Sequence, residues 1–296
     1  MKILNFGSLN IDIVYAVDHI VNPGETISAP SRTLHAGGKG LNQSVAAARA
    51  GASVIHAGNI GSDGAFLAQL LCDAGADISH LRTLDAPSGH AVIQVDKNGQ
   101  NSILVCGGAN RMYDRQYIDT VLSLGEDGDF VLTQNETNDV PYLLRAAHDR
   151  GLRVVLNPSP MTEEILSWPL ECVSVFLVNE TEGMAITGKE TPEDILSAME
   201  ARFPNAETIL TLGEKGSVRS FQGQRITQNI FPIKAVDTTA AGDTFTGYYL
   251  AGIIRGETAE TALRSASMAS AIAVSRPGAA PSIPLRKEVE DTLSVQ

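Results

Sequence analysis

A run of small residues, Asp-Thr-Thr-Ala-Ala-Gly-Asp at 237–243, precedes a long apolar stretch that is expected to be helical. The first turn of a helix carries N–H groups without intrahelical acceptors and the positive end of the helix dipole, so it can bind an anion. The small side chains of Ala241 and Gly242 would let a phosphate approach these groups closely. Asp243 lies in the same turn, where its carboxylate could accept a proton from an alcohol beside the anion. Taken alone, an aspartate there could equally serve only to favour the helix N-terminus.

A second segment, Gly-Gly-Lys-Gly-Leu-Asn-Gln at 37–43, is rich in glycine and opens another expected helix. Its exposed backbone, together with Lys39 and Asn42, offers hydrogen-bond donors and acceptors that suit several neighbouring hydroxyl groups. Read alone, the glycines could simply make a tight turn. Asp12 follows the first expected strand and is a further candidate for holding hydroxyls, although an aspartate at a strand end is more often just solvated.

An amide and a carboxylate follow another apolar run. The sequence Asn-Glu-Thr-Glu at 179–182 comes directly after residues 173–178. Ligands of α/β sheets bind beyond the carboxyl ends of the strands, so Asn179 and Glu182 could hold a hydrated Mg²⁺ beside a nucleotide. An equally simple interpretation is that they cap the following helix. Residues 211–216 also follow a strand, and their glycines suit a loop over a nucleotide.

Other signatures of chemistry are absent from the sequence. No G-x-G-x-x-G follows an expected strand, which argues against a nicotinamide-dependent dehydrogenase. Residues 183–189 fit G-x-x-x-x-G-K, but Glu190 stands where a P-loop requires Ser or Thr. None of the six histidines forms the H-E-x-x-H pattern of a zinc hydrolase.

The composition limits the classes of function. The chain has 296 residues, with 22 Lys and Arg against 34 Asp and Glu, which gives a formal net charge of −12. This charge argues against a nucleic-acid binder with a broad basic surface, so phosphates would have to be bound locally. Hydrophobic residues make up 43% and charged residues 19%, as in ordinary globular proteins.

The cysteines and the apolar stretches indicate the compartment. Cys72, Cys106 and Cys172 are odd in number and form no C-x-x-C pair, so neither a disulfide framework nor a thiolate metal site is expected. Polar residues interrupt the apolar run at the start of the chain, unlike a signal peptide. The apolar stretch 245–254 is much shorter than the roughly 20 residues that cross a bilayer. We therefore expect a cytoplasmic protein with no membrane or nucleic-acid partner.

Short apolar runs alternate with helical patterns along most of the chain, which is typical of repeated βαβ units. The sequence predicts an α/β fold whose doubly wound, mostly parallel sheet is flanked by helices. The expected strands, rich in Val, Ile and Leu as strands covered on both faces should be, are 3–8, 54–59, 130–134, 154–157, 173–178 and 208–212. The expected helices include 41–50, 64–74, 241–255 and 258–274. Gly51 and Gly75 are expected to end the first two, and Asp63 to cap the start of the second.

Two segments interrupt this alternation. Residues 11–34 have extended patterns around an Asn-Pro-Gly turn, and residues 89–106 are typical of a hairpin through Asp-Lys-Asn-Gly. We expect them to form a small second sheet over one end of the main sheet. Its apolar runs, 91–93 and 103–105, predict an uncovered face that favours a homodimer.

Together these segments resemble the ribokinase-like (pfkB) family of carbohydrate kinases over essentially the whole chain. Two signatures carry the resemblance, namely Gly-Gly-Lys-Gly-x-Asn-Gln at 37–43 and Asp-Thr-x-Ala-Ala-Gly-Asp at 237–243. The resemblance implies one kinase domain over residues 1–296, with a β lid formed by about 11–35 and 89–107. It implies ATP-dependent phosphorylation of a sugar's primary hydroxyl, with D-ribose first. The alternatives are fructose, a keto-deoxy sugar acid or a nucleoside as acceptor, or a sugar-binding regulator without catalysis.

The resemblance also implies roles for individual residues. It makes Asp243 the base, with Ala241 and Gly242 completing the anion hole. The implied sugar contacts are Asn10, Asp12, Gly38, Lys39, Gly40, Asn42, Glu136 and Asp243. The implied nucleotide contacts are Asn179, Thr211, Gly213, Lys215, Gly216 and Gly242.

Two cations follow from the same resemblance. Glu182, with Asn179, is tied to Mg²⁺. An activating K⁺ is expected near the anion hole, at positions that act mostly through backbone oxygens, namely Asp237, Thr239, Ala273, Arg276, Gly278 and Ser282. Two places depart from the family pattern: residues 134–138 keep the glutamate with different neighbours, and Ser267 stands where a larger His or Asn often lies near adenine.

Overall fold

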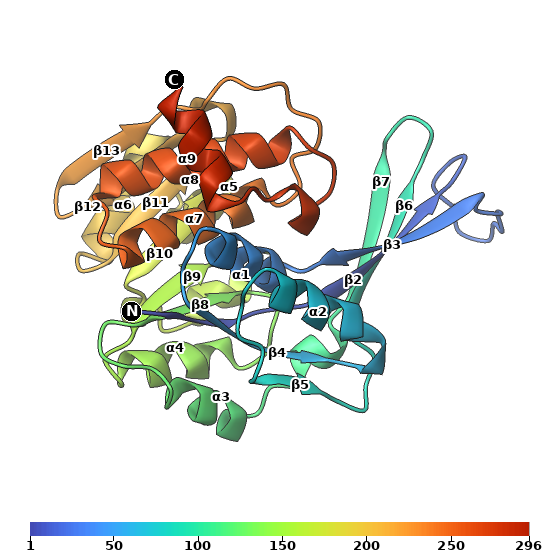
Figure 1. Cartoon of the computed structure of the whole chain (residues 1–296), viewed down its shortest axis with the longest axis horizontal. Helices are drawn as coiled ribbons and strands as arrows, with labels where there is room; N and C mark the ends of the chain where they lie inside the picture. Colours follow the sequence, from blue (N-terminus) through green and yellow to red (C-terminus); the bar gives the residue numbers. More distant parts are fainter. Residues whose placement is uncertain (296) are drawn as a thin grey trace.

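The computed structural model describes residues 1–295. Its main element is a nine-stranded sheet in the order β13-β12-β11-β10-β9-β8-β1-β4-β5 (Figure 1). Neighbouring strands are parallel from β5 to β11, and β12 and β13 are added antiparallel at one edge. The strands are β1 (Ile3–Phe6), β4 (Val54–Ile60), β5 (Leu81–Thr83), β8 (Phe130–Gln134), β9 (Arg153–Asn157), β10 (Val175–Asn179), β11 (Glu207–Thr211), β12 (Ser217–Phe221) and β13 (Gln224–Gln228).

Helices cover both faces of this sheet, because alternate residues of the central strands enter two separate hydrophobic cores. Ile3 packs in one core and the next residue, Leu4, in the other, and neither side chain is exposed. The first core is completed by α1 (Lys39–Arg49), α2 (Ala65–Asp73), α7 (Ala241–Ile254), α8 (Ala259–Val274) and α9 (Arg286–Ser294). The second is completed by α3 (Arg115–Leu122), α4 (Val140–His148), α5 (Glu180–Thr187) and α6 (Pro192–Arg202). The predicted doubly wound α/β fold is confirmed.

The predicted strands and helices are all present, with boundaries shifted by a few residues. The helix ends follow the expected chemistry, since Gly51 and Gly75 have φ of 90° and 91°, in the left-handed region that ends helices. None of the helices described in residues 1–295 is long and apolar enough to cross a membrane.

The predicted N-cap of α2 was wrong. Asp63 lies inside a short 3₁₀ helix, Ser62–Gly64, and no side chain caps the start of α2. Its carboxylate accepts instead from the backbone N and the Oγ of Ser88, at 3.0 and 2.6 Å. The two donors of Ser88, which is distant in sequence, hold the side chain away from the helix.

A second sheet of four strands stands away from the main body (Figure 1). Its order is β3-β2-β6-β7, with β2 and β6 parallel and the outer pairs antiparallel. The strands are β2 (Asn10–Ala16), β3 (Ser31–Gly37), β6 (Gly89–Val95) and β7 (Asn101–Cys106). We call this the small sheet. Every residue of β7 is exposed, and Leu104 retains 71% of its accessible surface. The small sheet therefore presents uncovered apolar surface.

Candidate active site

The start of α7 offers free backbone donors. Ala240 precedes the helix with φ of 60°, an uncommon value for a residue with a side chain. The amide of Ala241 donates to the carbonyl of Thr238 at 3.2 Å. Within the described residues, the amides of Gly242 and Asp243 have no acceptor. The predicted anion hole therefore has two free N–H groups, and its third amide is engaged in the turn that begins the helix.

Asp243 lies in this first turn and is held from two sides. Its side chain is buried, with 7% of the residue exposed. Asn42 Nδ2 donates to Oδ2 at 3.1 Å, and Gln43 Nε2 donates to Oδ1 at 2.9 Å. Burial raises the pKa of this carboxyl group, while the charge of Lys39 and the two amides lower it. The orientation of the Asp243 carboxylate is thus fixed at the N-terminus of α7.

Two glycines of the segment 37–43 let α1 begin at the site. A Cβ on Gly40 would lie 2.3 Å from the Cα of Gly7, so the start of α1 can rest on the end of β1 only without a side chain there. A Cβ on Gly37 would lie 2.2 Å from Oδ2 of Asp12. Gly40 therefore lets α1 start close enough to β1 for Asn42 to reach Asp243. Gly37 leaves room for the carboxylate of Asp12.

Two further carboxylates lie on the side of the small sheet. The backbone N of Lys39 donates to Oε2 of Glu136 at 2.9 Å, and Ser8 Oγ donates to the same oxygen. Burial, followed by the charge of Glu136, raises the pKa of Asp12 to about 6. Asn10 is buried, and its Oδ1 accepts from Asn110 at 2.8 Å. These predicted sugar contacts therefore surround the loop that opens α1.

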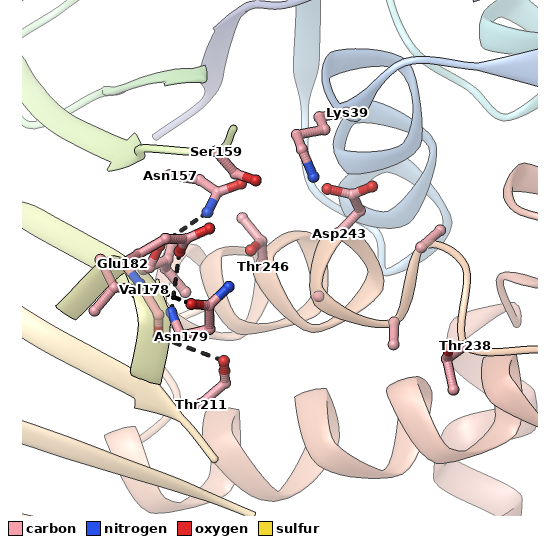
Figure 2. A pocket seen from close by; sticks show the side chains of 14 residues that line it. Lys39, Asn157, Ser159, Val178, Asn179, Glu182, Thr211, Thr238, Asp243 and Thr246 are labelled. Atoms are coloured by element: carbon pink, nitrogen blue, oxygen red, sulfur yellow. Dashed lines mark hydrogen bonds between the residues drawn. The ribbon is translucent and has the colours of Figure 1, made fainter. Parts of the chain in front are cut away.

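A polar cavity of about 260 Å³ lies between α7 and the carboxyl ends of β9, β10 and β11 (Figure 2). Among the residues that line it within 1–295, Lys39 is the only cation, and its ammonium group points toward Asp243. The lining residues are Lys39, Asn157, Ser159, Leu177, Val178, Asn179, Glu182, Thr211, Thr238, Ala240, Ala241, Gly242, Asp243 and Thr246. Free helix amides and one ammonium group suit this cavity to phosphate groups.

Asn179 and Glu182 contact each other at the start of α5. Asn179 Oδ1 accepts from the backbone N of Glu182 at 2.9 Å, and Glu182 Oε2 accepts from that of Asn179 at 3.0 Å. They therefore form a capping box at the start of α5. Both side chains also line the polar cavity, and burial raises the pKa of Glu182. Their oxygen atoms fit a hydrated Mg²⁺, which favours such ligands.

A second cavity of about 500 Å³ adjoins the first and shares Thr211, Thr238, Ala241 and Gly242 with it. Its walls are mainly apolar and include Ile230, Phe231, Ile233, Phe245, Ala271 and Val274. Gly213 and Gly216 line it from the predicted nucleotide loop, whereas Lys215 is exposed and lines neither cavity. Ser267 Oγ donates to the carbonyl of Asn229 at 3.2 Å. The apolar walls suit the flat ring system of a nucleotide base.

Most of the residues predicted for K⁺ lie on two loops. Hydrogen bonds to the side chain of Asp237 connect these loops. Its Oδ1 accepts from the N and Oγ1 of Thr239, at 2.9 and 2.6 Å, and its Oδ2 accepts from the N of Gly278 at 2.9 Å. Ala273 lies in the last turn of α8, which ends at Val274. Arg276 pairs with Glu288, and Ser282 Oγ donates to Ala279 O at 2.8 Å. No group of three or more His, Cys, Asp or Glu side chains in residues 1–295 is arranged to hold a metal. The K⁺ site therefore stays a prediction.

Several site residues were missed by the sequence analysis. Asn157 ends β9 and Ser159 lies two residues beyond it. Both line the polar cavity, as does Thr246, one turn into α7. Asn157 ends an apolar strand, as Asn179 does, so the same signal could have found it. Gln43 belongs to the motif 37–43 without a predicted role, although it contacts Asp243 directly.

Comparison with known proteins gives matches over most of the chain. The family model described as "pfkB family carbohydrate kinase" matches residues 1–286. A ribokinase of Haemophilus influenzae is 35% identical over 299 aligned residues, which cover 97% of this chain and 96% of that protein.

Two solved structures have the same fold. The ribokinase of Cryptococcus neoformans var. grubii serotype A, in complex with ADP, has a TM-score of 0.86 and 33% identity, with 98% of this chain and 99% of that chain covered. The ribokinase of Arabidopsis thaliana, complexed with ribose and ATP, has a TM-score of 0.85 and 33% identity, with 99% and 98% covered.

Proposed function

The chain belongs to the pfkB family of carbohydrate kinases, and from this premise we propose that it transfers the γ-phosphate of ATP to the primary hydroxyl of D-ribose, giving ribose 5-phosphate. The observation that carries the proposal is Asp243, a buried carboxylate next to two free helix amides and beside a cavity suited to phosphates. A base, an anion hole and a phosphate site are the parts that this transfer needs.

Phosphoryl transfer has a loose transition state, so positioning and neutralisation of charge matter more than proton removal. The amides of Gly242 and Asp243 and the ammonium group of Lys39 face the space where the transferring phosphoryl group would lie. Asp243 orients the sugar's primary hydroxyl and takes its proton late. Asn42 and Gln43 keep the carboxylate pointing at that hydroxyl.

The nucleotide and the sugar occupy opposite sides of Asp243 in this proposal. The base of ATP lies in the apolar cavity lined by Gly213 and Gly216, and its phosphates extend into the polar cavity. Ribose lies toward the small sheet, where Asp12 and Glu136 accept from its hydroxyls. The small sheet excludes water, which would otherwise compete as phosphoryl acceptor.

Mg²⁺ and K⁺ are proposed at separate places. Mg²⁺, when bound, would neutralise phosphate charge, and Glu182 with Asn179 would hold it through its water shell. K⁺ would lie between the loop of Asp237 and Thr239 and residues 273–282, where it would stabilise the turn before α7. We expect faster turnover with K⁺ than with Na⁺ at equal ionic strength, and equal turnover with both ions would contradict the K⁺ site.

The small sheet is proposed as the interface of a homodimer. Leu34, Ile103, Leu104 and Val105 are all exposed, and an uncovered apolar sheet favours a partner of the same kind. Sedimentation over a range of protein concentrations should show a dimer, and Leu104→Lys should shift it toward monomer. A chain that is monomeric at every concentration would overturn the interface.

The experiment for the proposed function is an acceptor panel. ADP release with ATP and Mg²⁺ is measured for D-ribose, 2-deoxyribose, fructose, 2-keto-3-deoxygluconate and a nucleoside. The highest kcat/KM is expected for D-ribose. A higher value for another acceptor would correct the substrate, and no ADP release with any of them would favour a binding protein without catalysis.

A further inference from the structure

A chain of buried side-chain amides leads away from Asp243 into the core. Gln43 Nε2 donates both of its hydrogens, to Asp243 Oδ1 at 2.9 Å and to Asn157 Oδ1 at 3.1 Å. Its Oε1 accepts from Gln134 Nε2 at 2.7 Å. Gln134 Nε2 also donates to Asn5 Oδ1 at 3.2 Å. Three amides from α1, β8 and β1 are thus joined in one line.

The direction of this line is set at both ends. At one end, Asn157 Nδ2 donates to the backbone carbonyl of Leu177 at 3.0 Å, so Asn157 Oδ1 faces Gln43. Asn5 Nδ2 donates to the backbone carbonyl of Gly40 at 2.8 Å and to Ser44 Oγ at 2.7 Å. A backbone carbonyl can only accept, so the nitrogen of Asn5 must face it and the oxygen of Asn5 must face Gln134. Gln134 then has to turn its nitrogen toward both Asn5 and Gln43. As a result Gln43 presents its oxygen to Gln134 and its nitrogen to Asp243.

The opposite orientation of Gln43 would be costly for the reaction. It would place Oε1 against the carboxylate of Asp243, where two acceptors repel each other, and it would remove a hydrogen bond that stabilises the ionised base. Gln134 is 1% exposed and does not line either cavity, so it can influence Asp243 only through its neighbours.

We propose that Gln134 is a positioning residue for Asp243, which acts by holding Oε1 of Gln43 and with it the amide that donates to the carboxylate. This inference rests on the proposed function, because it concerns the residue that takes the proton of the sugar. It assigns to the buried amides a task in catalysis besides packing.

The test replaces Gln134 by an apolar residue of similar length, Gln134→Met. We expect kcat to fall by up to about tenfold, because Gln43 Oε1 loses its donor and the amide that donates to Asp243 is held less firmly. KM for ribose and for ATP should change little, because no contact with either is removed. The acidic limb of the kcat profile should move to higher pH, since Asp243 loses part of the donation that lowers its pKa.

The matched control is Thr133→Val. Thr133 is the preceding residue on β8, is also fully buried, and donates to the carbonyl of Phe6 at 3.2 Å outside the amide line. This control should lose thermal stability without a change in kcat or in the pH profile. If Gln134→Met does not fold, Gln134→Ser removes the same donor arm and should give the same loss of kcat.

A double variant separates positioning from a general effect on the core. Gln43→Met should lower kcat at least as much as Gln134→Met, and combining the two should cause no further loss. Losses that multiply, or an unchanged kcat in folded Gln134→Met, would overturn the inference. The proposed function would remain in those cases, because the acceptor panel with the unmodified chain tests it separately.

Discussion

The two sides of the site are built in different ways. On the side of α7, Asp243 is buried and both of its oxygens accept from side-chain amides, and one of these amides, Gln43, is itself held by the buried Gln134. On the side of the small sheet, Asp12 is half-buried on β2, within a sheet whose outer strand β7 is exposed along its length. Its pKa of about 6 reflects burial and a neighbouring carboxylate, Glu136.

This difference indicates a division of labour. A base works best when its orientation is fixed before the reaction begins, and the buried amides provide that. Recognition of a sugar requires a site that opens and closes, and an element with little core of its own can move at low cost. We therefore expect changes on the α7 side to affect kcat and changes on the small sheet to affect the affinity for sugar.

The largest effect is expected for Asp243→Ala. Removal of the base should lower kcat by roughly 10²- to 10⁴-fold, the usual contribution of a general base. KM for ribose should change little because other groups hold the sugar. Steady-state ADP release at saturating ATP measures both constants, and a turnover close to that of the unmodified chain would defeat the role given to Asp243.

A smaller effect is expected for Asp12→Ala, and it should appear in KM for ribose and not in kcat. Loss of hydrogen bonds from the sugar to a charged group should raise KM for ribose about tenfold or more. The value of kcat at saturating ribose should stay close to that of the unmodified chain. An unchanged KM for ribose would speak against a sugar contact on the small sheet.

The pH dependence of sugar binding sharpens the comparison. Because the pKa of Asp12 is raised to about 6, its carboxylate becomes protonated below that pH and loses acceptor capacity, so KM for ribose should rise as pH falls through about 6. Glu136→Gln removes a negative charge that raises this pKa, so the midpoint should move to lower pH. A profile of KM against pH for both proteins is the measurement. A midpoint that stays in place or moves upward in the variant would show that another group governs binding.

The smallest expected effect is on folding stability and comes from a histidine in the core. His56 is fully buried, its Nδ1 lies 2.8 Å from Ser44 Oγ, and burial lowers its pKa to about 4. The unfolded chain binds a proton at this residue below about pH 6.5, whereas the folded chain does so only near pH 4, so folding stability should fall as pH falls between these values. The expected slope is about 1 kcal/mol per pH unit.

Denaturant unfolding across this pH range measures the slope. His56→Gln should flatten it, and His148→Asn, an exposed position on α4, should leave it unchanged. Equal slopes in His56→Gln and the unmodified chain would place the acid sensitivity elsewhere.

Much of the fold could be predicted because its signals are local. Apolar runs covered on both faces gave the strands of the main sheet, and the glycines after α1 and α2 gave the helix ends. The two small-residue motifs indicated Asp243 and the start of α1 because a helix N-terminus has the same chemistry wherever it occurs. The family assignment and the sugar kinase activity agree with the comparisons.

The remaining features depend on contacts between distant parts of the chain. Gln134 meets Gln43 across 91 residues, and Asn5 meets Gln134 across 129, so no spacing in the sequence connects them. The cap expected from Asp63 failed for the same reason, since its partner Ser88 comes from another segment. Ala241 was expected to offer a free amide, but the turn before α7 engages it. The sugar, nucleotide and metal roles of individual residues stay predictions.

Ribose binding to Asp243→Asn and Asp12→Asn, measured by calorimetry without turnover, tests the division of labour most directly. The account predicts that Asp243→Asn binds ribose about as tightly as the unmodified chain, whereas Asp12→Asn binds it much more weakly. Weak binding by Asp243→Asn together with unchanged binding by Asp12→Asn would contradict it.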